Sequence, residues 1–237
     1  MVVGPTLPLP GNVVQEAVRF DATCETAPVD FWPAVRLPDG LAAAAPKRRR
    51  EFLAGRTCAA RALARLGLGP CEVAIDADRA PVWPAGVVGS ITHSAGFAAA
   101  AVGLAAQLAG LGIDAEPIAA PSLVASVAKL ILAAGEPAAP PPGMDLETYV
   151  TLVFSAKESL FKCVYPQVRE PFFFEHARVT LAAVPGEFQA VLLKRFARPP
   201  ELQSPIRGRY GVAHGEVHTA VALPRPAAPR AGAWSPP

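Results

Sequence analysis

The chain has 237 residues, of which 22 are Lys or Arg and 20 are Asp or Glu, so its formal net charge is +2. Apolar residues make up 51% of the chain and charged residues 18%, a balance that excludes a wholly disordered protein and argues against a general polyanion binder. The length is sufficient for one large domain or two small ones, each with a buried core.

The first 45 residues are rich in Pro and Ala and carry only weak signals for secondary structure. No basic residue precedes the apolar stretch at the N-terminus, so we expect no signal peptide. The four cysteines, Cys24, Cys58, Cys71 and Cys163, form no C-x-x-C pair, so neither a zinc site nor a disulfide framework is expected. Together these features predict a cytoplasmic protein with reduced thiols.

A first helix is predicted over Pro46–Leu66, with Pro46 in its first turn and Gly67 just past its end. Its start is basic, K-R-R-R, and Arg48 and Arg56 lie within about 80° of one another around the helix. Two arginines near a helix N-terminus suit a small phosphorylated ligand, although a solvated cationic face remains the alternative. A nucleic-acid site is not expected, because the chain has no other basic segment and no aromatic platform.

Residues 71–95 predict strands and turns around a rigid W-P-A-G segment that begins at Trp83. Small residues then lead to His93 in the sequence V-G-S-I-T-H-S. A hydroxyl group and an imidazole at the end of a strand can hold a phosphate. The alternative interpretation is a histidine that only stabilises a turn.

Residues 97–103 and 108–114 are predicted to form a β-hairpin rather than a membrane span, because Gln107 interrupts the apolar run and Asp114 ends it. Asp114 and Glu116 are two residues apart, so their side chains share one face of the strand. Two carboxylates this close repel each other unless a cation or a proton neutralises them, and all-oxygen ligands suit Mg²⁺. A solvated strand end is the alternative.

The second half is predicted to begin with a helix over Pro121–Ala134, in which Ser122 is the N-cap and Gly135 follows the end. A Pro-rich connector covers residues 136–143. A long helix then starts at an Asp145 cap and ends at Pro166. Residues 171–223 are predicted to be rich in strands, and the tail after residue 223 is predicted to be disordered.

The long helix carries the sequence F-S-A-K-E-S-L-F-K. Glu158 and Lys162 lie four residues apart on its polar face, where they could form nothing more than a surface ion pair. Lys157 lies at the flank of the apolar face, where a lysine needs an anionic partner or a path to solvent.

In this order and spacing, the four motifs resemble those of 4′-phosphopantetheinyl transferases, most closely the branch of enterobactin synthetase component D and its actinobacterial relatives. The chain shows R-R-R-E-F from Arg48, then R-T-C-A from Arg56, then W-P-A-G-V-V-G-S-I-T-H ending at His93. G-I-D-A-E-P around Asp114 and K-E-S-L-F-K ending at Lys162 follow. The resemblance covers roughly residues 46 to 223.

The resemblance implies an α/β (α+β) fold of two similar subdomains related by a pseudo-two-fold axis, with the active site between them. We place the subdomains at residues 1–117 and 118–223, followed by a disordered tail at 224–237. Coenzyme A would be the co-substrate and Mg²⁺ the metal, with Mn²⁺ as a substitute. The reaction moves 4′-phosphopantetheine to a serine of an apo acyl, peptidyl or aryl carrier domain and leaves adenosine 3′,5′-bisphosphate. We expect a monomer with no nucleic-acid or membrane partner.

The resemblance also implies a role for individual residues. The metal ligands would be Asp114, Glu116 and Glu158, and Glu158 is in addition the candidate general base. The residues assigned to catalysis or to coenzyme A are Arg48, Arg56, Arg79, Thr92, His93, Lys157 and Lys162, of which His93 and Lys162 are catalytic. Arg48 and Arg56 would hold the 3′-phosphoadenosine end, and Lys157 the phosphate on the pantetheine side.

Two positions depart from the pattern of the family. Some relatives carry a lysine where this chain has Ile75, and the nearest cation here is Arg79. The segment after the long helix reads E-P-F-F from Glu170, which leaves open which residue packs on the pantetheine arm. Two other functions remain as alternatives: a Mg²⁺-dependent phosphohydrolase or nuclease, and a non-catalytic module that binds coenzyme A or a nucleotide.

Overall fold

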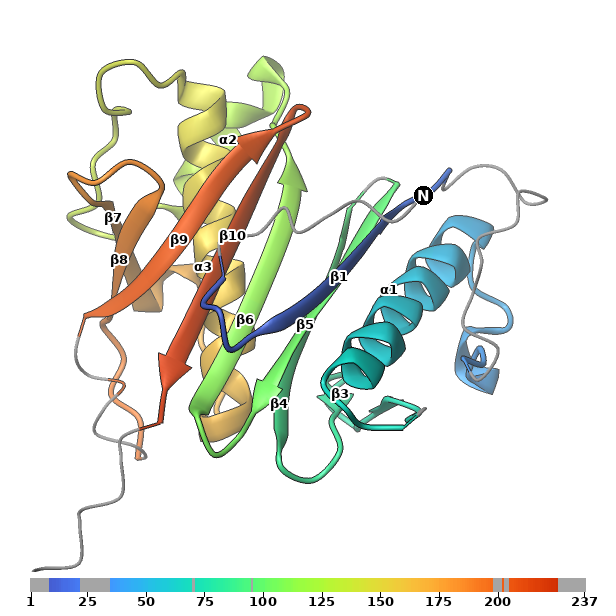
Figure 1. Ribbon diagram of the computed structural model, residues 1–237. Helices are drawn as coiled ribbons and strands as arrows, with labels where there is room; N and C mark the ends of the chain where they lie inside the picture. Colours follow the sequence, from blue (N-terminus) through green and yellow to red (C-terminus); the bar gives the residue numbers. More distant parts are fainter. Residues whose placement is uncertain are drawn as a thin grey trace, which may run out of the picture.

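The computed structural model describes residues 9–21, 35–69, 71–94, 96–197, 202 and 205–225. It is a mixed α/β structure with antiparallel sheets, as the sequence predicts. Figure 1 shows two halves side by side, each with a sheet and one long helix packed on it. Cys24 and all but the first two residues of the tail at 224–237 lie outside the described ranges.

The first half is a three-stranded sheet covered on one face by a helix. Its elements are β1 (Val14–Arg19), η1 (Asp39–Leu41), α1 (Pro46–Arg65), β2 (Ala74–Ile75), β3 (Pro81–Val82), β4 (Val87–Ser94) and β5 (Phe97–Leu104). The strand order is β1-β5-β4, and β2 and β3 pair only with each other. β1 was not predicted, because V-Q-E-A-V-R mixes polar and apolar residues and forms a strand through its pairing with β5.

The second half is a five-stranded sheet with strand order β6-β10-β9-β8-β7. Its elements are β6 (Leu108–Pro117), α2 (Pro121–Ile131), α3 (Leu146–Val168), η2 (Phe174–His176), β7 (Ala177–Leu181), β8 (Glu187–Leu192), β9 (Ile206–Ala213) and β10 (Glu216–Pro224). β6 therefore hydrogen bonds within the sheet of the second half, although it precedes the boundary that we place at residue 117.

The predicted hairpin of β5 and β6 is wrong, although both strands exist. β5 hydrogen bonds to β1 and β4, whereas β6 hydrogen bonds to β10. β5 is buried on both faces: Ala98 and Ala100 pack towards α1, while Phe97 and Ala99 pack on Ile113 of β6. The small alanines allow the two strands to pack face to face instead of pairing at their edges.

The two halves meet where β4 runs beside β6. The Ser90 hydroxyl accepts a hydrogen bond from the Ile113 amide at 3.0 Å, and the Thr92 hydroxyl accepts one from the Ala115 amide at 3.1 Å. Both pairs are 23 residues apart in sequence, so the strands run parallel along this seam. The hydroxyl groups of the V-G-S-I-T-H-S motif therefore join the halves.

The observed helix ends show which local sequence signals were sufficient to predict where a helix begins or ends. α1 begins at Pro46, and Gly67 follows its end with φ +89°, as predicted. Asp145 caps α3 by accepting a hydrogen bond from the Thr148 amide at 2.7 Å. Pro166 does not end α3, because a proline in the last turn removes only one backbone hydrogen bond. The helix continues to Val168.

The predicted start of α2 at Pro121 is confirmed, but its predicted cap and its predicted end are wrong. Ala120 precedes the first residue, Pro121, without a side-chain cap, so Ser122 lies inside the helix. The helix ends at Ile131, and Gly135 occupies a later turn with φ +84°. None of the helices in the described ranges has the length and apolar character needed to cross a bilayer.

Candidate active site

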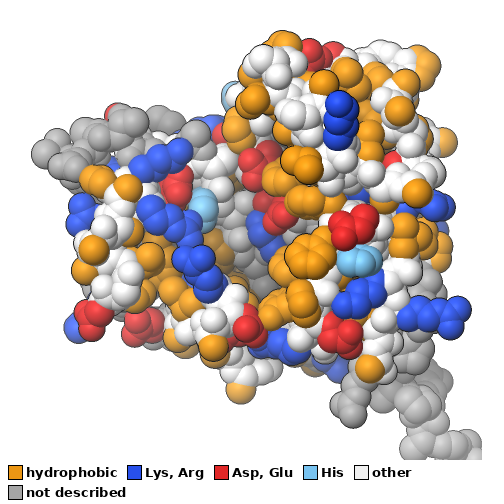
Figure 2. Space-filling model, turned by 180° about the vertical axis from the view of Figure 1, so that it is seen from behind, with side chains coloured by type: hydrophobic (Ala, Val, Ile, Leu, Met, Phe, Trp, Pro, Cys, Tyr) orange, Lys and Arg blue, Asp and Glu red, His pale blue; other side chains and the backbone are white. Residues whose placement is uncertain are grey.

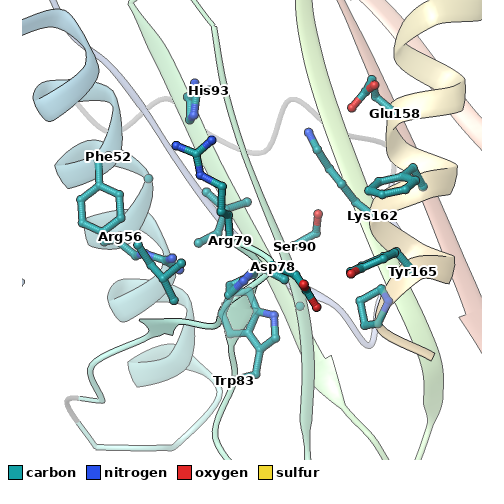
Figure 3. A pocket seen from close by; sticks show the side chains of 18 of the residues that line it. Phe52, Arg56, Asp78, Arg79, Trp83, Ser90, His93, Glu158, Lys162 and Tyr165 are labelled. Atoms are coloured by element: carbon teal, nitrogen blue, oxygen red, sulfur yellow. The ribbon is translucent and has the colours of Figure 1, made fainter. Parts of the chain in front are cut away.

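A cavity of about 540 Å³ lies between α1 and α3, where the two halves meet. Figure 2 shows this hollow, with basic side chains and a histidine on the α1 side and acidic side chains on the other. Figure 3 shows Phe52 and Arg56 on α1 facing Glu158, Lys162 and Tyr165 on α3. The structure brings together six of the predicted site residues in the wall of this cavity: Arg48, Arg56, Arg79, His93, Glu158 and Lys162.

On the α1 side, Arg48 and His93 contact each other directly. Arg48 Nη1 lies 2.8 Å from His93 Nε2, and because a guanidinium can only donate, Nε2 accepts. The proton of the neutral ring is then on Nδ1, which lies 3.7 Å from the Glu51 carboxylate. Burial lowers the pKa of His93, Arg48 and Lys162 lower it further, and Glu51 opposes them. The imidazole is therefore neutral at pH 7.

Arg56 is a buried cation, and one of its N–H donor groups has no hydrogen-bond partner among the described residues. Its residue is only 8% exposed, and its guanidinium lies 5.1 Å from the centroid of the Phe52 ring. Within the described ranges, Arg56 Nη1 has no hydrogen-bond partner. Burial lowers the pKa of Arg56 to about 10. A desolvated, under-bonded guanidinium in a cavity wall favours an anionic ligand.

Across the cavity, Asp114 is almost fully buried beneath α3. Lys162 Nζ lies 2.6 Å from its Oδ1, to which Thr92 also donates at 3.2 Å. Asp114 Oδ2 is buried and has no hydrogen-bond partner in the described part of the chain. The carboxylate can therefore still accept a ligand on one oxygen.

Gly112 sets the position of Asp114, because it lets β6 approach α3 closely. A Cβ on Gly112 would lie 1.8 Å from the Ser159 carbonyl oxygen. This contact explains the glycine of the G-I-D-A-E motif.

Further negative charge surrounds Asp114. Burial raises the pKa of Glu116 to about 7, with a further contribution from the Asp114 charge. Burial also raises the pKa of Glu158, where Asp114 acts in the same direction and Lys162 opposes it. As they stand, no three His, Cys, Asp or Glu side chains among the described residues converge closely enough to hold a metal ion. The oxygen-only donors and the unpartnered Asp114 Oδ2 nevertheless fit the chemistry of Mg²⁺.

Lys157 does not line this cavity. Its ammonium is buried and donates to Glu136 Oε2 at 2.7 Å and to the carbonyls of Ile131 and Phe174 at 2.5 and 2.9 Å. Burial lowers the pKa of Lys157, and Glu136 opposes the shift. Glu136 is thus the anionic partner that the position of Lys157 on the helix requires. It lies in the Pro-rich connector, where no sequence pattern marked it.

A smaller pocket of about 230 Å³ adjoins the cavity through Glu158, Phe161 and Pro171. Lys157 and the exposed Phe173 contribute to its wall. Phe172 also lines this pocket, but its side chain is largely buried in the core of the second half.

Among the residues of the cavity wall that sequence reasoning missed are the polar side chains of Asp78 and Tyr165. A signal existed for Tyr165, which lies three residues after Lys162 and seven after Glu158, on the same face of the helix. Asp78 lies in the turn between β2 and β3, and no local pattern placed that turn beside α3.

Comparisons with known proteins place both halves in one family. Residues 37–103 match the 4′-phosphopantetheinyl transferase N-terminal domain, and residues 110–215 match the 4′-phosphopantetheinyl transferase superfamily. The chain is 39% identical over 205 residues to the 4′-phosphopantetheinyl transferase Svp of Streptomyces mobaraensis, covering 79% of this chain and 77% of Svp. It is 32% identical over 192 residues to the 4′-phosphopantetheinyl transferase PptT of Mycobacterium tuberculosis, covering 77% and 82%. Enterobactin synthase component D of Salmonella typhimurium is 37% identical over 184 residues, covering 73% and 71%.

Proposed function

Since the chain belongs to the 4′-phosphopantetheinyl transferase superfamily and transfers 4′-phosphopantetheine from coenzyme A to carrier proteins, we propose that the cavity between α1 and α3 is the site of this transfer. The observation that carries the proposal is that a buried arginine on α1 faces a carboxylate and a lysine on α3 across one cavity. Arg56, whose Nη1 has no hydrogen-bond partner among the described residues, lies on one wall, and Glu158 and Lys162 lie on the other.

Arg48 and Arg56 are proposed to bind the 3′-phosphate of coenzyme A. Arg56 Nη1 is already desolvated and has no protein acceptor among the described residues, so a phosphate oxygen would satisfy it at little further cost. Arg79 lines the same cavity and would supply the charge that some relatives carry at the position of Ile75. Thr92 contributes by holding Asp114.

Asp114, Glu116 and Glu158 would hold a Mg²⁺ or Mn²⁺ ion, whose charge would reduce the repulsion between the pyrophosphate and the incoming nucleophile. Glu158 has a second proposed role. Burial raises its pKa, which makes its carboxylate a better base for the proton of the carrier serine.

The serine oxygen forms a bond to the phosphorus on the pantetheine side, and the bond to the bridging pyrophosphate oxygen breaks. Lys162 would stabilise the negative charge that develops on these oxygens, because its ammonium reaches the same wall as Glu158. His93, held by Arg48, would donate or accept a hydrogen bond at the phosphates. The leaving group is adenosine 3′,5′-bisphosphate.

The smaller pocket is the proposed location of the pantetheine arm. Phe173 is exposed there, and Lys157 lies behind it on Glu136. Phe173, rather than the buried Phe172, is therefore our candidate for the residue that packs on the arm. Lys157 would keep the wall of this pocket in place through its ion pair with Glu136. If a phosphate of coenzyme A replaced Glu136 as its partner, Lys157 would bind that phosphate directly.

We propose acyl, peptidyl and aryl carrier domains as substrates and a cytoplasmic monomer as the working form. The buried free thiols of Cys58 and Cys163 suit a reducing compartment. A phosphohydrolase that uses the same carboxylates is the second candidate function, and a non-catalytic module that binds coenzyme A is the third.

One experiment separates these functions. The protein is incubated with coenzyme A, Mg²⁺ and several apo carrier domains, and each carrier is analysed by intact mass. A transferase adds one phosphopantetheine to the carrier, and Glu158→Gln abolishes the addition. Consumption of coenzyme A without any gain in carrier mass would instead indicate hydrolysis, and coenzyme A binding without turnover would indicate a binding module.

A further inference from the structure

The β2–β3 hairpin is a small element that forms part of the cavity wall. Each of its strands has two residues, Ala74–Ile75 and Pro81–Val82, and they pair only with each other. A two-stranded hairpin of this size has little stability of its own. Its turn nevertheless places Asp78 and Arg79 in the wall of the cavity, so contacts elsewhere must hold it there (Figure 3).

Asp76 is the residue that orders the turn. Its Oδ1 accepts hydrogen bonds from the backbone amides of Asp78 at 3.0 Å and Ala80 at 2.8 Å. Its Oδ2 accepts a hydrogen bond from Arg169 Nη1 at 2.7 Å. One carboxylate thus closes the turn and ties it to a residue of the other half, 93 positions later in the chain.

Arg169 is presented to the hairpin by the end of α3. It is the C-cap residue, with φ 53°, and its amide closes the last helical turn on the Tyr165 carbonyl. The guanidinium lies 5.8 Å from the centroid of the Tyr165 ring and 3.6 Å from an Asp78 carboxylate oxygen. Asp78 also raises the pKa of the Tyr165 hydroxyl. Two residues of the hairpin and two of the helix end therefore form one polar cluster.

We propose that Arg169 is a positioning residue: through Asp76 it holds the β2–β3 hairpin across the cavity and thereby sets the affinity for coenzyme A. This inference rests on the proposed function, because Arg79 on the same turn is assigned there to coenzyme A. A lone ion pair with a half-exposed arginine contributes little to global stability. Here the pair orders a hairpin that has no sheet to support it, so its effect is local. Arg169 does not line the cavity, so we expect kcat to be independent of it.

The test uses the full-length protein with Arg169→Ala, and with Arg209→Ala as the matched control. Arg209 is likewise an exposed arginine in an ion pair with a carboxylate, here Glu187 at 3.7 Å. It lies on β9, away from the cavity. We expect Arg169→Ala to raise the KM for coenzyme A about three- to tenfold with kcat unchanged. Arg169→Lys should recover part of the loss, and Arg209→Ala should change neither constant. An unchanged KM, or a fall in kcat of the same size as the rise in KM, would overturn the proposal.

A second readout does not depend on catalysis. Hydrogen exchange at the Asp78 and Ala80 amides should become faster in Arg169→Ala, because their acceptor Asp76 loses its anchor, while the amides of α3 and β6 stay protected. Unchanged exchange at both hairpin amides would also overturn the proposal. If wild-type protein transfers no phosphopantetheine, the proposed function fails, whereas the exchange result still decides whether Arg169 orders the hairpin.

Discussion

Lys162 Nζ lies 2.6 Å from Asp114 Oδ1, so a lysine of α3 neutralises a buried carboxylate of β6 that is also a proposed metal ligand. The ammonium and a metal ion would thus stabilise the same carboxylate. In the protein without metal, Lys162 supplies the only cation within salt-bridge distance of Asp114 among the described residues.

Lys162→Ala should therefore lower the free energy of unfolding in EDTA by about 1–3 kcal/mol, since the buried Asp114 loses its cationic partner and Lys162 is itself partly exposed. Mg²⁺ should stabilise the variant more than the wild type. Chemical denaturation with and without Mg²⁺ measures both effects. Lys194→Ala, which removes a surface ion pair to Glu170, is the control. Equal stabilisation of wild type and Lys162→Ala by Mg²⁺ would contradict this interpretation.

The contact of Gly112 with α3 gives a second prediction. Gly112→Ala would place a Cβ 1.8 Å from the Ser159 carbonyl oxygen, so the backbone of β6 or of α3 would have to shift. We expect a loss of about 3 kcal/mol or more in the free energy of unfolding, measured by urea denaturation.

Gly211→Ala is the matched control, because no atom lies within 4 Å of a Cβ built there. It should leave the unfolding midpoint nearly unchanged. Similar losses in the two variants would mean that a general effect of alanine in strands, and not the packing of α3 on β6, limits position 112.

Local and distant determinants of this fold were not equally visible in the sequence. The ends of α1 follow from Pro46 and Gly67 alone, because helix boundaries depend on neighbouring residues. The strand pattern of β5 and β6 was also visible, but a run of small apolar residues does not say whether two strands pair at their edges or pack face to face. The hairpin prediction failed for that reason.

The candidate site likewise contains residues that local motifs predict and residues that only tertiary packing brings in. His93, Asp114 and Glu158 could be proposed from the sequence because each lies in a motif with a recognisable spacing. The partner of Lys157 was not found, because Glu136 reaches it from a connector with no pattern of its own. Contacts of this kind depend on tertiary packing, which no local rule encodes.

His218 gives a prediction about acid stability. It is 1% exposed, its ring lies 5.1 Å from that of Phe97, and burial lowers its pKa although the nearby Glu216 opposes the shift. Below about pH 6.5 the unfolded chain takes up a proton that the folded protein does not. Stability should therefore fall as pH decreases from 6.5 towards the lower folded pKa, by at most about 1.4 kcal/mol per pH unit for this group.

His218→Leu should flatten this part of the curve of unfolding free energy against pH between 6.5 and 5, whatever its effect on stability at pH 8. His214→Asn, at an exposed turn position with φ 54°, should keep most of the wild-type slope, because His214 makes only the smallest of the contributions that shift the pKa of His218. A slope in His218→Leu equal to that of the wild type would show that other groups cause the loss at acid pH.

The most direct test of the central claim, that coenzyme A binds in the cavity between α1 and α3, compares coenzyme A with dephospho-coenzyme A, which lacks only the 3′-phosphate. We expect the wild type to prefer coenzyme A in kcat/KM, because the buried Arg56 has an unsatisfied donor for that phosphate. A charge-assisted hydrogen bond corresponds to roughly ten- to a hundredfold discrimination, so Arg56→Ala should reduce the preference by about that factor. If Arg56→Ala instead slows both substrates equally and leaves the ratio unchanged, the 3′-phosphate does not bind at Arg56, and the proposed orientation of coenzyme A in the cavity is wrong.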